Sequence, residues 1–339
     1  MDAGVAVYVT GVHGTEDGPG DRAILETSET EIDPDTSDLL ASLRGPAEDG
    51  LNTFLVLDPV RRKAVTGVFD LDGADVPLQS LFEGRAAEEA AETAPYLADL
   101  TVAPDEPPSR FTTGFLKAHW GRDTGLLIRS RGSFAEVRRH LRRFTKLRRE
   151  ADGRWFFFRF WDPLVAGRYF RTISESERRA EQWFGRGLID SFIVEEEAGK
   201  TATCFRPAQL PEHANRPLGP VVLKEWELRP FRTNAFDRDV ERMARNLKGD
   251  FGPELKHYPE GAVARLIRPV LERFTALGFR RKEHLHVIAA WSLFYGPGFI
   301  EMDREGELAR ICAADAPERE RFAAMKARME GFGAPEEVQ

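Results

Sequence analysis

Residues that commonly bind metals or act as nucleophiles are scattered along this chain of 339 residues. His284 and His286 are two residues apart, a spacing that points their side chains away from each other on a helix. No His-Glu-x-x-His motif or Cys/His set accompanies them. Cys204 and Cys312 are far apart in the sequence, and we expect both to be buried free thiols. The sequence therefore predicts no metal site and no cofactor.

Other patterns that could support catalysis each lack a necessary part. The glycine-rich loop 11–20, GVHGTEDGPG, has no phosphate-binding spacing, and its two acidic residues would repel a phosphate. The acidic run 195–197 is expected to be solvated, because adjacent side chains do not converge on one substrate atom. No Gly-x-Ser-x-Gly nucleophile motif is present. We expect a protein that is not an enzyme; the alternative is an enzyme with a dispersed site, such as Arg159 with Asp162 and a distant histidine.

A run of basic residues stands out in a chain whose net charge is −8. Its members on the polar side of a predicted helix are Arg138, Arg139, Arg142 and Arg143, followed by Lys146, Arg148 and Arg149. Three interpretations remain open: a solvated helix face, a docking surface for an acidic protein, or a nucleic-acid-binding module formed by 138–149. We expect no nucleic-acid partner, because the chain is acidic and no interleaved stacking aromatics are evident.

The stretch 154–163, RWFFFRFWDP, places aromatic residues around Arg159. The hairpin signal Asp152-Gly153 precedes it, and a period of two puts aromatics on both faces, which predicts a central strand covered on both sides. An arginine on such a face must be paired and hydrogen-bonded. Asp162 suits an N-cap and Pro163 the first helical position. We predict that Arg159, Asp162 and Pro163 are structural.

The elements that position these residues begin with short strands. VAVYV (Val5 to Val9), NTFLVLDPV (52–60) and TGLLIRS (124–130) have the pattern of strands, the second stopped by its Asp-Pro pair. The alanine- and glutamate-rich stretch Ala86 to Thr93 favours a helix that Pro95 ends.

Two helices carry N-terminal signals. Ser133 with Glu136 forms a capping box in front of a helical period that reaches residue 144. Ser174 with Glu177 forms a second one, and Gly185 ends that helix. Together with the strands, these signals predict a mixed α/β (α+β) N-terminal lobe, 1–185, with a central β-sheet flanked by helices.

The remainder of the chain is predicted to be a connection, 186–230, followed by an all-α C-terminal lobe, 231–339. Its apolar stripes predict helices over 236–247 and over 263–277, with a kink at Pro269. Two more are expected over 281–295 and 304–328.

Apolar surface in this helical lobe exceeds what a small lobe can hide. AAWSLFYGPGF (289–299) is its most aromatic segment. Because exposed apolar surface often marks an interface, we predict that Trp291, Phe294 and Tyr295 are partner-binding anchors. The lobe is expected to carry much of the specificity for a partner.

Composition limits the class of protein. Hydrophobic residues make up 42% of the chain and charged residues 31%, as in a globular protein. No apolar run reaches the roughly 18 residues needed to cross a bilayer, and the N-terminus has no secretory signal. We expect no membrane partner and a cytoplasmic location.

The order of these motifs resembles one bacterial family. TFLVLDPV, LQSLFEG, APYLADL, GLLIRSRGSFAEVRRHLRRF and DGRWFFFRFWDPLV follow one another as in the effector chaperones, or adaptors, of the type VI secretion system. The resemblance covers about residues 53–184, and its most specific parts are Arg159 to Pro163 and the turn Ala94 to Leu97. Pro59-Val60 stands where the family usually has glycine or alanine, which affects only a turn.

The resemblance implies a function in binding. Members of this family are not enzymes; they bind a toxic effector in the producing cell and help to load it onto the valine-glycine-repeat spike. It therefore implies an effector partner, the spike as a second partner, a cytoplasmic location and no catalytic residues. The basic residues Arg138, Arg139, Arg142 and Arg143 would then bind an acidic surface of the effector or the spike.

Overall fold

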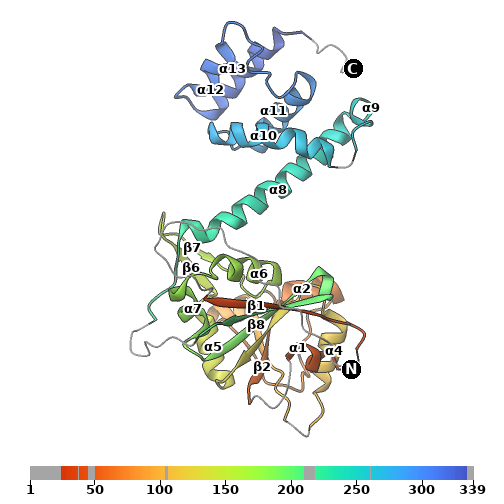
Figure 1. Ribbon diagram of the computed structural model, residues 1–339, viewed down its shortest axis with the longest axis vertical. Helices are drawn as coiled ribbons and strands as arrows, with labels where there is room; N and C mark the ends of the chain where they lie inside the picture. The colour runs from red at the N-terminus through yellow and green to blue at the C-terminus, as the bar shows by residue number, and fades with distance from the viewer. Residues whose placement is uncertain are drawn as a thin grey trace. The chain divides into compact units, whose positions relative to one another are not determined.

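The computed structural model describes residues 24–36, 38–44, 50–103, 106–209, 218–259 and 261–333 (Figure 1). The expected strand Val5 to Val9 and the loop 11–20 lie outside these ranges. The chain forms two compact units, one up to Pro230 and one from Phe231 onward. Each unit is described separately.

A seven-stranded sheet is the centre of the first unit, and all of its strand pairs are antiparallel. In spatial order its strands are β1 (Leu25–Glu31), β9 (Thr201–Pro207), β8 (Ile189–Glu196), β5 (Gly125–Ser130), β2 (Asn52–Leu57), β4 (Tyr96–Asp99) and β3 (Leu78–Ser80). The predicted strands at 52–60 and 124–130 are adjacent, with Leu55 opposite Leu127.

Helices cover both faces of this sheet, because its central strands are apolar on both sides. On one face α1 (Leu39–Arg44) and α4 (Arg110–His119) pack against alternate residues such as Leu55 and Ile193. On the other face, aromatic rings from α5 (Phe134–Arg142), α6 (Pro163–Thr172) and α7 (Glu177–Phe184) meet Phe54 and Phe192. The predicted fold class, a mixed lobe with a flanked sheet, is confirmed.

A small second sheet contains the aromatic strand. Its order is β10 (Val222–Leu223), β6 (Lys146–Arg149) and β7 (Trp155–Phe157), so β7 is an edge strand of three residues. Trp155 and Phe157 are 60% and 63% exposed. The predicted central strand over 154–161 is therefore wrong: only the residues beyond β7, such as Phe158 and Phe160, are buried.

The buried aromatics surround Trp183 on α7. Phe144 stacks on Trp183 with ring centres 3.9 Å apart, and Phe158, Phe160 and Tyr169 also lie against its ring. Each such aromatic pair contributes about 0.5–1.5 kcal/mol beyond its buried area. Phe158, Phe160 and Trp161 thus do form core, but from a loop rather than a strand.

Several predicted boundaries need correction. Ser133 and Glu136 form the predicted capping box, whereas Ser176, not Ser174, precedes α7, and its side chain accepts no capping hydrogen bond. Gly185 ends α7 in the left-handed conformation, as predicted. The alanine-rich helix is only α3 (Arg85–Glu89). The unit also contains α2 (Pro59–Thr66).

The segment 186–230 is not a connection, because it supplies three strands. A short 3-10 turn, η2 (Glu197–Gly199), links β8 to β9. Further along, the carboxylate of Glu227 is buried with Arg179, and it also accepts a hydrogen bond from the Tyr169 hydroxyl at 2.6 Å. This network fixes the start of α8 (Glu225–Asp250) to α6 and α7 within the first unit.

The second unit is helical, as predicted. It contains the rest of α8, α9 (Gly252–Leu255), α10 (Ala262–Ala276), α11 (Lys282–Phe294), α12 (Glu307–Ala313) and α13 (Glu318–Glu330). The helix α10 continues through Pro269. The helix expected over 304–328 is two helices, because Pro317 lacks the N–H that a continuous helix requires.

Two apolar clusters hold these helices together. One joins α8, α9, α10 and α11 around residues such as Leu247 and Ile267, and the other joins α10, α11, α12 and α13 around Phe274 and Met325. No helix in the described ranges is long and apolar enough to cross a membrane.

Candidate functional site: an aromatic groove in the helical unit

The three predicted anchors lie along one groove of the second unit. The groove has a volume of about 950 Å³. Its walls come from the end of α8, from α9 with the residues after it, and from α11. Its lining residues are Asp250, Phe251, Glu254, Leu255, His257, Tyr258, His286, Val287, Ala290, Trp291, Leu293, Phe294 and Tyr295. The structure therefore brings Trp291, Phe294 and Tyr295 together, although it shows no partner on them.

The anchors are half-buried because each is held from behind. Phe294 meets the Phe251 ring edge-on, with centres 4.9 Å apart. Trp291 lies against Phe299 and Phe322, and the Tyr295 hydroxyl donates a hydrogen bond to the Gly333 carbonyl. Aromatic side chains fixed in this way lose little conformational entropy when a ligand binds.

Helical spacing explains why α11 presents these residues to one side. Val287, Ala290, Trp291 and Phe294 follow one another at intervals of three, one and three, which places them on one stripe of the helix. The opposite stripe, with Ile288 and buried neighbours, faces the apolar clusters. The small side chain of Ala290 leaves space between its larger neighbours.

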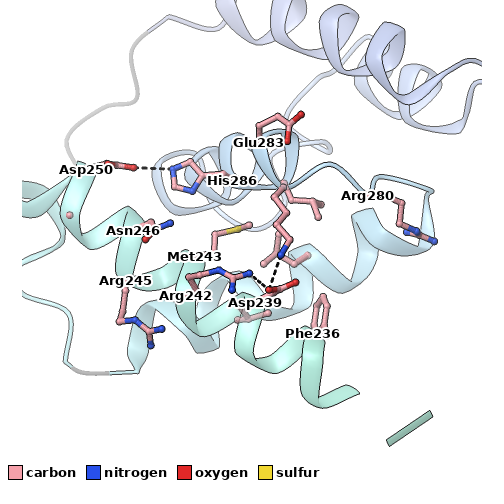
Figure 2. A pocket seen from close by; sticks show the side chains of 15 residues that line it. Phe236, Asp239, Arg242, Met243, Arg245, Asn246, Asp250, Arg280, Glu283 and His286 are labelled. Carbon is pink, nitrogen blue, oxygen red and sulfur yellow. Dashed lines mark hydrogen bonds and ion pairs between the residues drawn. The ribbon is translucent and has the colours of Figure 1, made fainter. Parts of the chain in front are cut away.

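A second, more polar pocket adjoins the groove (Figure 2). Its volume is about 660 Å³, and Figure 2 shows charged side chains of α8 facing those at the start of α11. Asp239 pairs with Arg242 and with Lys282, the latter at 3.1 Å. The pair of His286 and Asp250, 3.0 Å apart, lines both spaces.

The walls of the groove combine apolar surface with titratable side chains. Its floor is aromatic and aliphatic, and its titratable side chains include Asp250, Glu254, His257 and His286. Apolar clefts with a small number of polar groups bind apolar ligands or side chains. Among the described residues, no group of three or more metal-ligating side chains is assembled.

The signature residues of 154–163 lie in the first unit and form crossed ion pairs. Asp58 caps α2 and accepts hydrogen bonds from the Val60 and Arg61 backbone N–H groups, while its second oxygen pairs with Arg159. Asp162 caps α6 in the same way, and its second oxygen lies 3.7 Å from the Arg61 guanidinium. Each Asp-Pro corner thus receives an arginine from the other segment.

These pairs give Arg159, Asp162 and Pro163 positions that fit a structural function. The side chain of Asp58 is 1% exposed, whereas that of Arg159 is 43% exposed, so the arginine is not the buried strand residue that we expected. Pro163 is the first residue of α6 and is buried. No histidine in the described ranges hydrogen-bonds to Arg159 or Asp162, so the dispersed site considered above is not assembled there.

The arginine helix is not a uniformly solvated face. Arg138 donates hydrogen bonds to the Ser80 and Phe82 carbonyls and pairs with Glu83, and Arg142 donates one to the Leu81 carbonyl and also pairs with Glu83. Arg139 and Arg143 are exposed. Neither of these two contacts the loop, although Arg143 donates a hydrogen bond to the Gly219 carbonyl at 2.9 Å.

Two sequence inferences about charge and aromatics need correction. Glu195 is not solvated: it is 3% exposed and accepts hydrogen bonds from the Gly121 and Asp123 N–H groups. Burial raises its pKa to about 7. Exposed aromatics do accompany the basic run, because Trp155 and Phe157 lie opposite Arg148 and Lys146 on the β6–β7 hairpin. Side chains alternate between the two faces of a strand, and this alternation could have indicated both the burial of Glu195 and the exposure of Trp155 and Phe157.

Comparison with known proteins adds one finding. Residues 53–180 match the model of a family described as a domain of unknown function (DUF4123). The matched range lies within the first unit and contains both Asp-Pro corners, whereas the groove lies outside it. No curated protein and no solved structure matches the chain.

Proposed function

We propose that the protein is a non-enzymatic chaperone or adaptor that binds a type VI secretion effector in the cytoplasm and helps to load it onto the valine-glycine-repeat spike. The observation that supports this most is the family match over residues 53–180. It covers almost the same stretch as the resemblance to the secretion adaptors, and it is independent of the structure. A binding function also suits a groove whose floor is aromatic and aliphatic.

In this proposal the groove binds a helical segment of the effector. A helix packs into an apolar groove through side chains spaced at i, i+3, i+4 and i+7, and the aligned Trp291 and Phe294 offer matching contacts along α11. Aromatic anchors of this kind carry most of the binding energy at many interfaces. The family-matched unit would then provide the common scaffold, and the helical unit the specificity.

Replacement of the anchors tests this assignment. The doubly substituted protein Trp291→Ala, Phe294→Ala is co-expressed with the product of the toxin gene that neighbours its own, and an affinity tag on the toxin measures retention. We expect the variant to be lost from the complex, while Leu266→Ser, at a residue 46% exposed on α10 and outside the groove, is retained. Thermal unfolding of both variants establishes that they remain folded. Equal retention of the two variants would show that the groove does not bind the effector.

A further inference from the structure

The edge strand β7 has unused backbone hydrogen-bonding groups. Arg154 and Phe158 bond across to Arg149 and Thr145, and in an antiparallel pair such bonds alternate along the strand. The N–H and C=O groups of Trp155 and Phe157 therefore point away from β6. Within the described residues, no strand pairs with this outer edge.

The same strand exposes its two largest side chains. Trp155 and Phe157 lie on one face, with Phe157 stacked on Phe82 at 5.6 Å between ring centres. Proteins usually protect an open edge with charge or proline and do not expose aromatics beside it. Large exposed apolar groups at such an edge indicate an interaction surface.

Two basic side chains are exposed beside these aromatics, and one exposed acid, Glu150, follows β6. Lys146 and Arg148 are exposed on the aromatic face of the hairpin, and the Lys146 ammonium lies over the Trp155 ring. Neither has an acidic partner among the described residues. The nearby acids Glu83 and Asp152 are already paired with arginines.

We propose that this aromatic edge, formed by β7 with Phe82, Lys146 and Arg148, binds an extended acidic segment of another protein by strand addition. The added strand bonds to the backbone groups of Trp155 and Phe157. Its alternate side chains lie beside the aromatic rings, where acidic groups meet Lys146 and Arg148. This site is in the first unit and is separate from the groove, so it does not depend on the proposed function.

Protein fits this edge better than single-stranded nucleic acid, although stacking aromatics and basic residues occur in both kinds of site. Stacking of bases needs free ring faces, whereas Phe82 covers Phe157 and Lys146 covers Trp155 on one side. The outward backbone groups are suited to a peptide.

Fluorescence anisotropy of labelled peptides with the full-length protein tests the proposal. The probe is about eight residues long, within the roughly three to ten residues of most strands, and alternates threonine with glutamate. Comparison peptides replace glutamate by lysine, or carry N-methyl groups on the alternate amides that would bond to β7. Oligothymidylate is the nucleic-acid probe. We expect the glutamate peptide to bind at least tenfold more tightly than either comparison peptide.

Variants then locate the site. We expect Trp155→Ser, Phe157→Ser to weaken binding of the glutamate peptide at least tenfold, and Leu164→Ser, at an apolar residue 56% exposed on α6, to leave it unchanged. Both variants must keep the unfolding temperature of the parent. Equal affinity for the glutamate and lysine peptides, or tight salt-sensitive binding of oligothymidylate without peptide binding, would overturn the proposal.

Discussion

At the scale of single residues, the crossed pairs at the two Asp-Pro corners explain why arginine and aspartate recur three positions apart in both segments. Asp58 is buried and bonds to Arg159, while Asp162 lies near Arg61. Each carboxylate also caps a helix. Asp58 therefore connects the end of a strand, the start of a helix and a distant segment. A substitution at one corner should therefore destabilise the other corner as well.

Loss of the Arg159 guanidinium should reduce stability moderately. We expect Arg159→Ala to lower the free energy of unfolding by about 1–3 kcal/mol, the range for a hydrogen bond to a charged group. Arg159 is 43% exposed, so the effect stays below that of a fully buried pair. Urea unfolding measures the change. The control is Arg154→Ala, whose surface pair with Asp152 should contribute at most about 1 kcal/mol. Equal stability of the two variants would show that Arg159 does not hold the corners together.

His140 should make the fold sensitive to acid. Burial lowers the pKa of His140 to about 4, and its ring bonds to the Trp183 carbonyl at 2.7 Å. The unfolded chain binds a proton near pH 6.5, so this contribution is present above that pH and is lost as the pH falls through 4. The total loss is about 3 kcal/mol.

Replacement of this histidine tests the pH dependence. We expect His140→Gln, which cannot titrate, to show a shallower fall in stability between pH 6.5 and 4 than the parent protein. The measurement is urea unfolding at several pH values. Other titrating groups, including Glu195 and His119, are the same in both proteins, so the difference between the two slopes reports His140 alone. Identical slopes would contradict the assignment.

At the scale of elements, the helix α5 holds the loop after β3 in place through hydrogen bonds and ion pairs. We expect the doubly reversed variant Arg138→Glu, Arg142→Glu to destabilise the first unit by roughly 2 kcal/mol or more, because the loop carbonyls lose charged donors and Glu83 meets like charge. The control is Arg139→Glu, at an exposed position, where a change within about 0.5 kcal/mol is expected. Circular dichroism during heating compares the two. Unchanged stability of the double variant would support the solvated helix face that the sequence predicts.

Elements with strong local signals could be predicted from the sequence. The strands near 52–60 and 124–130, the capping box of α5 and the amphipathic helices after residue 231 follow from apolar spacing alone. The strands β8 and β9 were missed because the acidic run and the prolines that follow looked like surface. Strand β7 was misplaced because aromatics exposed at an edge have the same pattern as aromatics in a core.

The candidate surfaces could be predicted in part, because only some of their residues have a recognisable local pattern. Trp291, Phe294 and Tyr295 could be selected because 289–299 is the most aromatic segment of the helical lobe, and the structure leaves all three half-buried along the groove. The loop that binds Arg138 and Arg142, and the Asp58 that binds Arg159, are distant in sequence. Such pairs form only when distant segments fold together, and apolar periodicity does not indicate which segments do so.

At the scale of the whole molecule, the proposed function gives each unit a separate task. The family match and the structural Asp-Pro corners lie in the first unit, while the aromatic groove lies in the second. A scaffold with a distinct recognition unit is what an adaptor between two proteins requires. The account therefore depends on whether the protein connects an effector to the spike.

A three-component pull-down tests this connection most directly. A valine-glycine-repeat spike protein from the same genome is immobilised, and the candidate toxin effector is added with or without the full-length protein. We predict that the spike retains the toxin only when the protein is present, and that the groove variant Trp291→Ala, Phe294→Ala fails to replace it. Retention of the toxin by the spike to the same extent without the protein would contradict the account.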